Sequence, residues 1–137
     1  MNRLPGTICA VDALDSIALV EVQIGAQRCT ATLVGVVDDL RQWPVGLAVT
    51  LLFKETEVSL GKNLSGLISL RNRLPAVVIA VESGRLLTSV TLDCDGHRLG
   101  SVITSGSAER LALAPGDHVE ALIKANEMHL VRSEPGT

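Results

Sequence analysis

Aromatic residues are nearly missing from this 137-residue chain, which has one Trp, one Phe and no Tyr. Proteins that bind single-stranded nucleic acid stack the bases on aromatic rings, so this scarcity argues against such a partner. The formal net charge of -3 argues against it too, because a phosphate backbone requires a basic surface. With 47% hydrophobic residues, the chain is globular in composition, and its core must consist mainly of Val, Leu, Ile and Ala.

Close cysteine pairs and long apolar runs are missing as well. Cys9, Cys29 and Cys94 are scattered, which argues against a disulfide framework or a zinc site, and we expect each to act as a small buried hydrophobic residue. No run reaches the roughly 18 apolar residues of a membrane span. The first residues do not resemble a secretory signal. These features predict a cytoplasmic protein that has no membrane insertion, no metal and no cofactor.

An internal repeat organises the chain. A single shift along the sequence places Asn2–Pro5 on Asn72–Pro75, and it also places Gly46 on Gly116 and Lys54 on Lys124. Such self-similarity indicates one small domain present twice. We therefore predict two domains, residues 1–62 and 67–134, joined by a short linker rich in Gly, Ser and Asn.

Both domains have the pattern of short β-strands. The second contains a hairpin turn at Asp95-Gly96 and a helical pattern over 105–113, for which Ser105 or Ser107 could be the N-cap. The order of five strands with a short helix between the third and fourth is typical of a small OB-like barrel. The predicted fold is therefore mainly β, with two tandem five-stranded OB-like barrels. The strands are expected at 4–11, 17–23, 27–34, 47–53 and 58–60, and at 74–81, 87–93, 98–104, 119–124 and 128–131.

Residues for catalysis are not grouped in the sequence. His97, His118 and His129 are far apart, and no nucleophile and base occur in a recognisable arrangement. Gly100 and Gly106 are isolated, so there is no glycine-rich phosphate loop. We expect the protein not to be an enzyme.

Small hydroxyls and cations remain as candidate ligand-binding groups. Hydroxyls and free backbone N–H groups at a helix start can hold an anion, and Arg and Lys side chains suit oxyanions. A plainer interpretation also stands on the residues alone, in which the hydroxyls cap the helix and the cations are solvated. The candidate binding residues are Ser69, Arg71, Asn72, Thr104, Ser107, Ala108 and Lys124.

The second domain resembles the molybdate-binding Mop domains of the molbindin, or transport-associated OB, family. The matching stretches are 69–74, 102–113, 115–116 and 121–125. The resemblance implies an oxyanion held by the counterparts of Ser69, Arg71 and Lys124 in one domain. The other half of the site is implied to come from a neighbouring domain, through the counterparts of Thr104, Ser107 and Ala108. It also implies a homo-oligomer, expected to be a trimer of two-domain chains, and it makes Asn72 part of the motif.

The first domain departs from this pattern. The repeat places Val34 on Thr104, Val37 on Ser107, Asp38 on Ala108 and Met1 on Arg71, which removes the hydroxyls and adds a carboxylate that would repel a dianion. Only Lys54 is retained. We expect the first domain to have lost its part of the binding site.

Two functional hypotheses follow. The first is a non-enzymatic, cytoplasmic protein that binds molybdate or tungstate for storage, buffering or molybdenum homeostasis, with sites between domains of an oligomer and no nucleic-acid partner. The alternative is a degenerate sensor or interaction module that docks to a molybdate transporter ATPase or a molybdate-responsive regulator. The changes at 34–38 favour the alternative, whereas the retained set in the second domain favours oxyanion binding.

Overall fold

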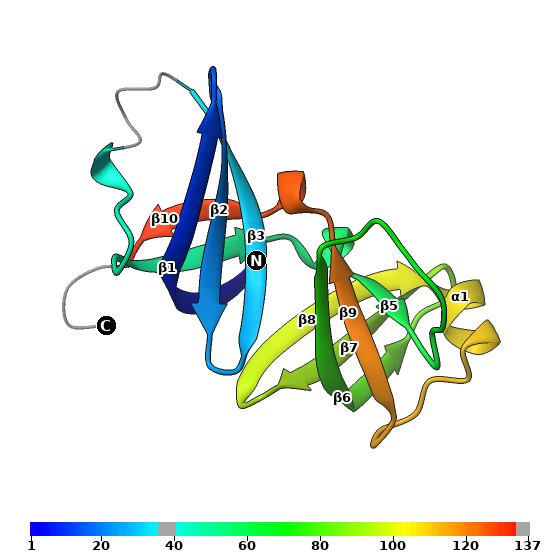
Figure 1. Cartoon of the computed structure of the whole chain (residues 1–137). Coiled ribbons are helices and arrows are strands. Elements are labelled where there is room, and N and C mark those ends of the chain that lie inside the picture. The colour runs from blue at the N-terminus through cyan, green and yellow to red at the C-terminus, as the bar shows by residue number, and fades with distance from the viewer. Residues whose placement is uncertain (36–40, 134–137) are drawn as a thin grey trace.

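The computed structural model describes residues 1–35 and 41–133, which form two five-stranded antiparallel sheets (Figure 1). The first half of the chain carries five strands, and the second half carries five more. The elements are β1 (Asn2–Leu14), β2 (Ile17–Ile24), β3 (Gln27–Val34), β4 (Ala48–Phe53), η2 (Glu55–Glu57), β5 (Ser59–Gly61), β6 (Asn72–Ser83), β7 (Leu87–Cys94), β8 (His97–Thr104), α1 (Ser105–Arg110), β9 (His118–Ile123), η3 (Ala125–Glu127) and β10 (His129–Arg132).

Alternation and turn chemistry explain the hairpins. Strands β2 and β7 share one pattern of burial along their eight residues, as expected for sheets with a single core-facing side. At the β7–β8 turn, Asp95 and Gly96 have φ of 53° and 90°, which is the left-handed conformation that tight hairpins require. Both long strands bend at a bulge in the same place, between Ile8 and Ala10 and between Val78 and Ala80. The repeat in sequence is therefore a repeat in structure.

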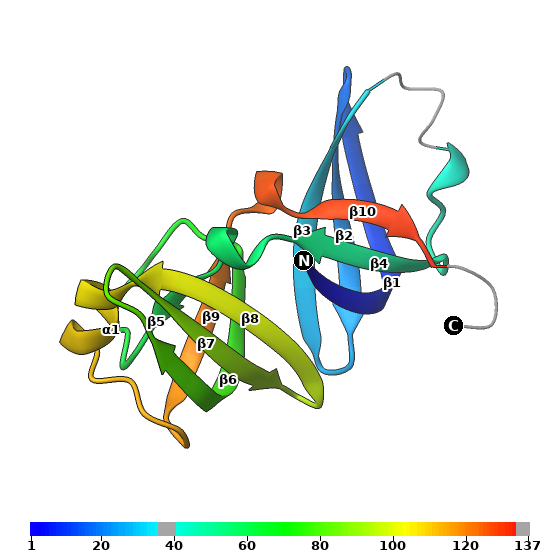
Figure 2. The same ribbon diagram turned by 180° about the vertical axis from the view of Figure 1, so that it is seen from behind.

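The last strand of each half is exchanged between the two sheets. The order in one sheet is β10-β4-β1-β2-β3 and in the other β5-β9-β6-β7-β8. Strand β10 pairs with β4, with Leu130 opposite Leu51, and β5 pairs with β9, with Leu60 opposite Ala121. Figure 2 shows β10 lying along β4 at the edge of the first sheet. The chain was expected to divide into two domains between residues 62 and 67. The sheets do not follow this division, because β10 of the second half belongs to the first sheet and β5 of the first half belongs to the second sheet.

The exchange joins both halves into one hydrophobic core. Asn2 reinforces the connection, because its side-chain amide donates to the carbonyl oxygen of Gly100 at 2.9 Å and accepts from the Gly100 N–H at 2.8 Å. The buried side chains form a single continuous cluster that draws on both sheets and includes Leu4, Val20, Leu51, Phe53, Leu74, Leu92, Leu99, Ile123, Met128 and Leu130.

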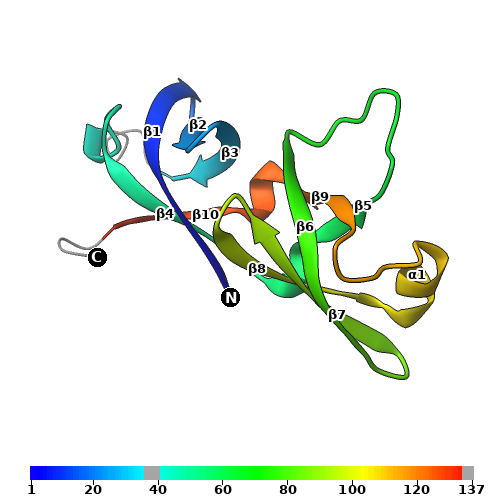
Figure 3. The same cartoon turned by 90° about the horizontal axis from the view of Figure 1, so that it is seen from below.

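Helix α1 is shorter than the predicted helix, and its N-cap is neither Ser105 nor Ser107. Its N-cap is Thr104, whose Oγ1 accepts from the N–H of Ser107 at 3.2 Å. The chain leaves the helix through Ala112, which has a φ of 49°. In all three views the helix lies at the end of the molecule that is remote from the first sheet (Figure 1, Figure 2, Figure 3). The corresponding segment of the first half falls partly on residues 36–40, outside the described residues.

Candidate anion-binding site

A cavity of about 310 Å³ brings together three of the predicted binding residues. Ser69 and Arg71 come from the segment before β6, and Lys124 follows β9 directly. Strand pairing explains their meeting, because Asn72 at the start of β6 lies opposite Ile123 at the end of β9. The cavity is lined by Thr32, Ser69, Leu70, Arg71, Lys124, Ala125 and Asn126.

The charges at this cavity suit an anion. Arg71 and Lys124 are both exposed, so that their charged groups remain available to a ligand. The hydroxyl of Ser69 adds a neutral donor. Thr32 was not predicted from the sequence; it belongs to β3 of the first sheet, and its Oγ1 is 3.5 Å from the carbonyl oxygen of Ala125. No local signal marks Thr32 as a site residue, because the contact depends on how the two sheets meet.

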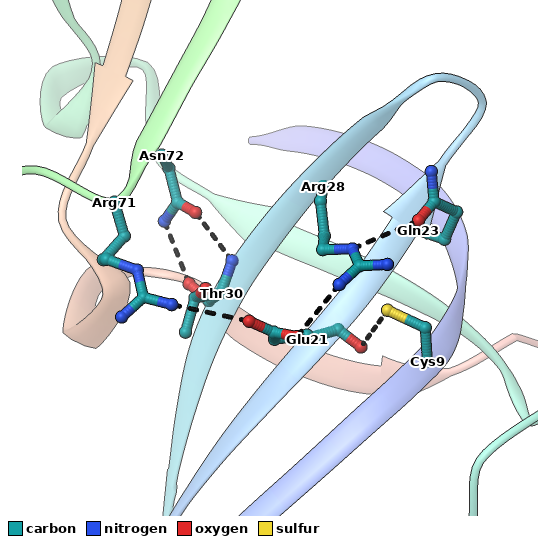
Figure 4. Close-up of polar contacts among 7 residues, drawn as sticks. All are labelled: Cys9, Glu21, Gln23, Arg28, Thr30, Arg71 and Asn72. Atoms are coloured by element: carbon teal, nitrogen blue, oxygen red, sulfur yellow. Dashed lines mark hydrogen bonds and ion pairs between the residues drawn. The ribbon is translucent and has the colours of Figure 1, made fainter.

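Arg71 is also paired with a carboxylate of the first sheet. Its Nη2 lies 3.4 Å from Oε1 of Glu21 on β2, while Nη1 of Arg28 lies 3.4 Å from the other carboxylate oxygen (Figure 4). Glu21 therefore stands between two guanidinium groups. Sequence reasoning did not single out Glu21, since a lone Glu in an alternating strand is usually a solvated residue.

Asn72 lies in a different setting from that of a ligand-binding side chain. It is fully buried, and its Oδ1 accepts from the Thr30 N–H at 2.7 Å while its Nδ2 donates to the Thr30 carbonyl oxygen at 2.9 Å (Figure 4). The same Nδ2 lies 3.4 Å from the sulfur of Met128. Within this chain the side chain of Asn72 thus holds the two sheets together, and its binding role stays a prediction.

Thr104, Ser107 and Ala108 do not meet the other candidates within one chain. Thr104 donates to Ser107 Oγ at 2.8 Å, and this pair stands at the exposed start of α1. Ala108 lines a separate cavity of about 190 Å³, together with Thr88, Ser105 and other residues of the second half, and none of these residues lines the first cavity. The structure thus divides the predicted residues into two groups at two places.

The first half lacks the matching arrangement. Lys54 stands where the second half has Lys124, and it is exposed at the start of η2, where its backbone N–H donates to the Glu57 carboxylate at 2.9 Å. Val34, which matches Thr104, is 79% exposed and offers no polar side-chain group. Glu55 occupies the position of Ala125 and adds a carboxylate. Val37 and Asp38 lie outside the described residues.

Another cavity lacks the charges of an anion site. A cavity of about 490 Å³ includes Asp93, Asp95 and His118 among its lining residues, but no cation. Among residues 1–35 and 41–133, no group of three His, Cys, Asp or Glu side chains is placed to hold a metal ion. Within the same residues, no helix has the length and apolar character needed to cross a membrane.

Comparison with known proteins places this geometry in a family. Residues 68–130 match the TOBE domain, a range that contains the cavity residues Ser69, Arg71 and Lys124 and also helix α1. The whole chain is similar to the crystal structure of the cytoplasmic molybdate-binding protein ModG with molybdate bound, with a TM-score of 0.89, 29% identity and 96% of each chain covered. The chain belongs to the molbindin (Mop) family. It shares with ModG the tandem arrangement of two OB-type domains.

Curated relatives of this molbindin match it over part of their length. It is 40% identical over 78 residues to the molybdenum import ATP-binding protein ModC of Brucella abortus, covering 56% of this chain and 22% of that protein. It is 44% identical over 68 residues to the molybdenum-pterin-binding protein MopA of Rhodobacter capsulatus, covering 48% of this chain and 26% of that protein. The chain thus spans about a quarter of the length of these curated relatives.

Proposed function

We propose that this molbindin is a non-catalytic, cytoplasmic protein that binds molybdate or tungstate for storage, buffering or molybdenum homeostasis. The observation that carries the proposal is the cavity that brings Ser69, Arg71 and Lys124 together from separate elements. The full-length likeness to ModG, which is described as a cytoplasmic molybdate-binding protein, supports the choice of ligand.

The chemistry of these residues suits a tetrahedral dianion. Arg71 offers a planar fork of donors and Lys124 a point charge, and together their two positive charges balance a charge of −2. Ser69 contributes a neutral hydroxyl donor. Sulfate has the same charge and shape, so in this proposal discrimination against it depends on the size of the completed pocket.

The site is completed by another copy of the chain. Thr104, Ser107 and Ala108 do not line the cavity of their own chain, yet their hydroxyls and backbone N–H groups are the donors that the second half of the site requires. In this proposal they approach the ligand from a neighbouring protomer, and the expected assembly is a trimer of two-domain chains. No cofactor takes part.

A second candidate function is an interaction module that docks to a molybdate transporter ATPase or a molybdate-responsive regulator. Val34, which stands where the second half has the hydroxyl of Thr104, offers no such group and supports it, as does the likeness of part of the chain to ModC. In this case the binding cavity would be a remnant, and oxyanion affinity would be lacking.

Isothermal titration with molybdate, tungstate and sulfate separates the two functions. Binding of molybdate or tungstate with weaker binding of sulfate is expected, and Arg71→Ala combined with Lys124→Ala should abolish it. Lys54→Ala is the matched control, because this lysine occupies the same position in the first half and should leave affinity unchanged. Absence of heat with either metal oxyanion would refute the binding function and favour the docking module.

A further inference from the structure

Glu21 is the acidic group that contacts Arg71 at the edge of the candidate cavity. Its side chain is 27% exposed, whereas those of Arg71 and Arg28 are 61% and 59% exposed. Each guanidinium contacts a different oxygen of the carboxylate at 3.4 Å (Figure 4). The negatively charged Glu21 carboxylate therefore lies beside a site that is expected to bind an oxyanion.

The position of Glu21 follows from the way in which the sheets meet. On β2 it lies opposite Thr30 of β3, and Thr30 is the residue held by Asn72. Arg71 immediately precedes Asn72, so the clamp that joins the sheets also brings Arg71 over the carboxylate. In the second half, the repeat places Thr91 at the position of Glu21, opposite Gly100, and no charge is present there.

We propose that Glu21 is an internal competitor for Arg71 and sets the affinity of the oxyanion site. This inference rests on the proposed binding function, and it assigns to a residue of the first half an effect on oxyanion affinity. The Glu21 carboxylate partly neutralises the positive charge of Arg71, and it also repels an incoming dianion. Arg28 contacts the same carboxylate, and its positive charge reduces the repulsion that Glu21 exerts on the ligand.

Competition outweighs any orienting effect of Glu21 on the Arg71 side chain. A charge-assisted pair that fixes an arginine is bidentate, with distances of about 2.7–2.9 Å. The contact here is a single one at 3.4 Å, and Arg71 is largely exposed, so the carboxylate does little to position the guanidinium. Its negative charge nevertheless acts on the ligand through space, with a strength that salt reduces.

The test compares oxyanion affinity in three variants of the full chain by titration with molybdate at low and at high salt. Glu21→Gln keeps the shape and the acceptor oxygen but removes the charge. Glu21→Thr introduces the residue that the repeat carries at Thr91, which strand pairing tolerates. Asp95→Asn is the matched control, because it removes one negative charge at the β7–β8 turn, in a residue that lines another cavity.

Both Glu21 variants should bind molybdate about two- to fivefold more tightly at low salt, as expected for an exposed ion pair, and the gain should shrink as salt is added. Asp95→Asn should leave affinity unchanged. Equal or weaker binding by Glu21→Gln, or an equal gain from Asp95→Asn, would overturn the inference while the wild-type protein still binds. Failure of the wild type and of all variants to bind would instead refute the proposed function.

Discussion

The side-chain amide of Asn72 forms two hydrogen bonds with the main chain of Thr30, one with its N–H at 2.7 Å and one with its carbonyl oxygen at 2.9 Å. The matching residue of the first half, Asn2, makes the same two contacts with Gly100. The two Asn residues thus form a pair of equivalent contacts, and each one links its own half of the chain to the other half by hydrogen bonds. This symmetry explains why Asn recurs at both positions, although the first half has no counterpart of Arg71 or Thr104.

Replacing Asn72 with Ala should lower the free energy of unfolding by about 2–4 kcal/mol. The change removes two buried hydrogen bonds and leaves the Thr30 N–H and carbonyl without partners, which costs about 1–3 kcal/mol for each unsatisfied group. Denaturant unfolding of the full chain measures it, with Asn2→Ala as the related variant and Arg71→Ala as the exposed neighbour that should change stability little. Unchanged stability together with lost oxyanion affinity would show that Asn72 contacts the ligand instead.

Strand exchange predicts that both halves unfold together. Leu130 lies on β10 in the first sheet but belongs to the second half, and it is 7% exposed. Leu130→Ala should cost about 2–5 kcal/mol through the cavity that it leaves. The loss should appear equally in Trp43 fluorescence, which reports on the first half, and in hydrogen exchange of β7.

The control for this prediction is the wild-type protein followed by both probes. Its two unfolding curves should coincide at every denaturant concentration, because one core serves both sheets. Separate transitions, or a Leu130→Ala effect restricted to Trp43, would mean that each half folds alone and that the exchanged strands contribute little.

The three thiols should differ in reactivity. Cys29 and Cys94 are buried, at 0% and 3% exposure, whereas Cys9 is half-buried and its Sγ lies 3.4 Å from the Glu21 carbonyl oxygen. Loss of solvation on burial, with a smaller contribution from Cys94, raises the pKa of Cys29 to about 12. Because the thiolate is the reactive form, Cys29 should resist alkylation even at pH 9, where ordinary thiols ionise.

Mass spectrometry after brief alkylation of the native protein measures this difference. We expect modification at Cys9 only, and modification of all three residues after unfolding. Modification of Cys29 at the rate of Cys9 in the native protein would contradict the buried position of this thiol in the core.

Asp117 should make folding stability depend on pH in the acid range. Its carboxylate accepts from the Ala114 N–H at 2.9 Å and from Lys62 Nζ at 3.0 Å, and these two hydrogen bonds, led by that of Ala114, lower the pKa of Asp117. A lowered pKa in the folded state means that the stabilisation is complete above the unfolded value near 3.8 and is lost as the pH falls below it.

Thermal unfolding of Asp117→Asn as a function of pH tests this linkage. The variant should melt below the wild type at neutral pH, and the gap between their melting temperatures should close as the pH is lowered below 3.8. The exposed Asp95→Asn is the control, with a gap that stays small throughout. A gap that widens in acid would contradict the role assigned to the Asp117 carboxylate.

Much of the fold was predictable because local patterns determine it. Alternation and the Asp95-Gly96 turn were enough to predict β7 and β8, and the repeat carried the same arrangement to β2 and β3. The exchange of β5 and β10 was not predictable, because local patterns do not determine which strands pair. Because β4 and β9 share Val and Leu at matching positions and are each followed by Lys, the alternation in sequence does not show which of them pairs with 58–60 and which with 128–131.

The candidate site was predictable only where short motifs carry it. Ser69, Arg71 and Lys124 were identified through a family resemblance, and the structure brings them to one cavity. Asn72 belongs to the same motif, but its burial depends on the position of Thr30 in the other sheet, which no local pattern reveals. Glu21 and Thr32 remained unidentified because they meet the site only when the two sheets come together.

The most direct measurement for the binding function is the position of tungsten in a crystal of the protein soaked with tungstate, located by its anomalous signal. We predict a peak in the cavity within hydrogen-bond reach of Ser69, Arg71 and Lys124, facing Thr104 and Ser107 of a neighbouring protomer, with no peak beside Lys54. A crystal that shows no tungsten at Arg71 and Lys124, or that shows it only at surface sites remote from them, would contradict the account.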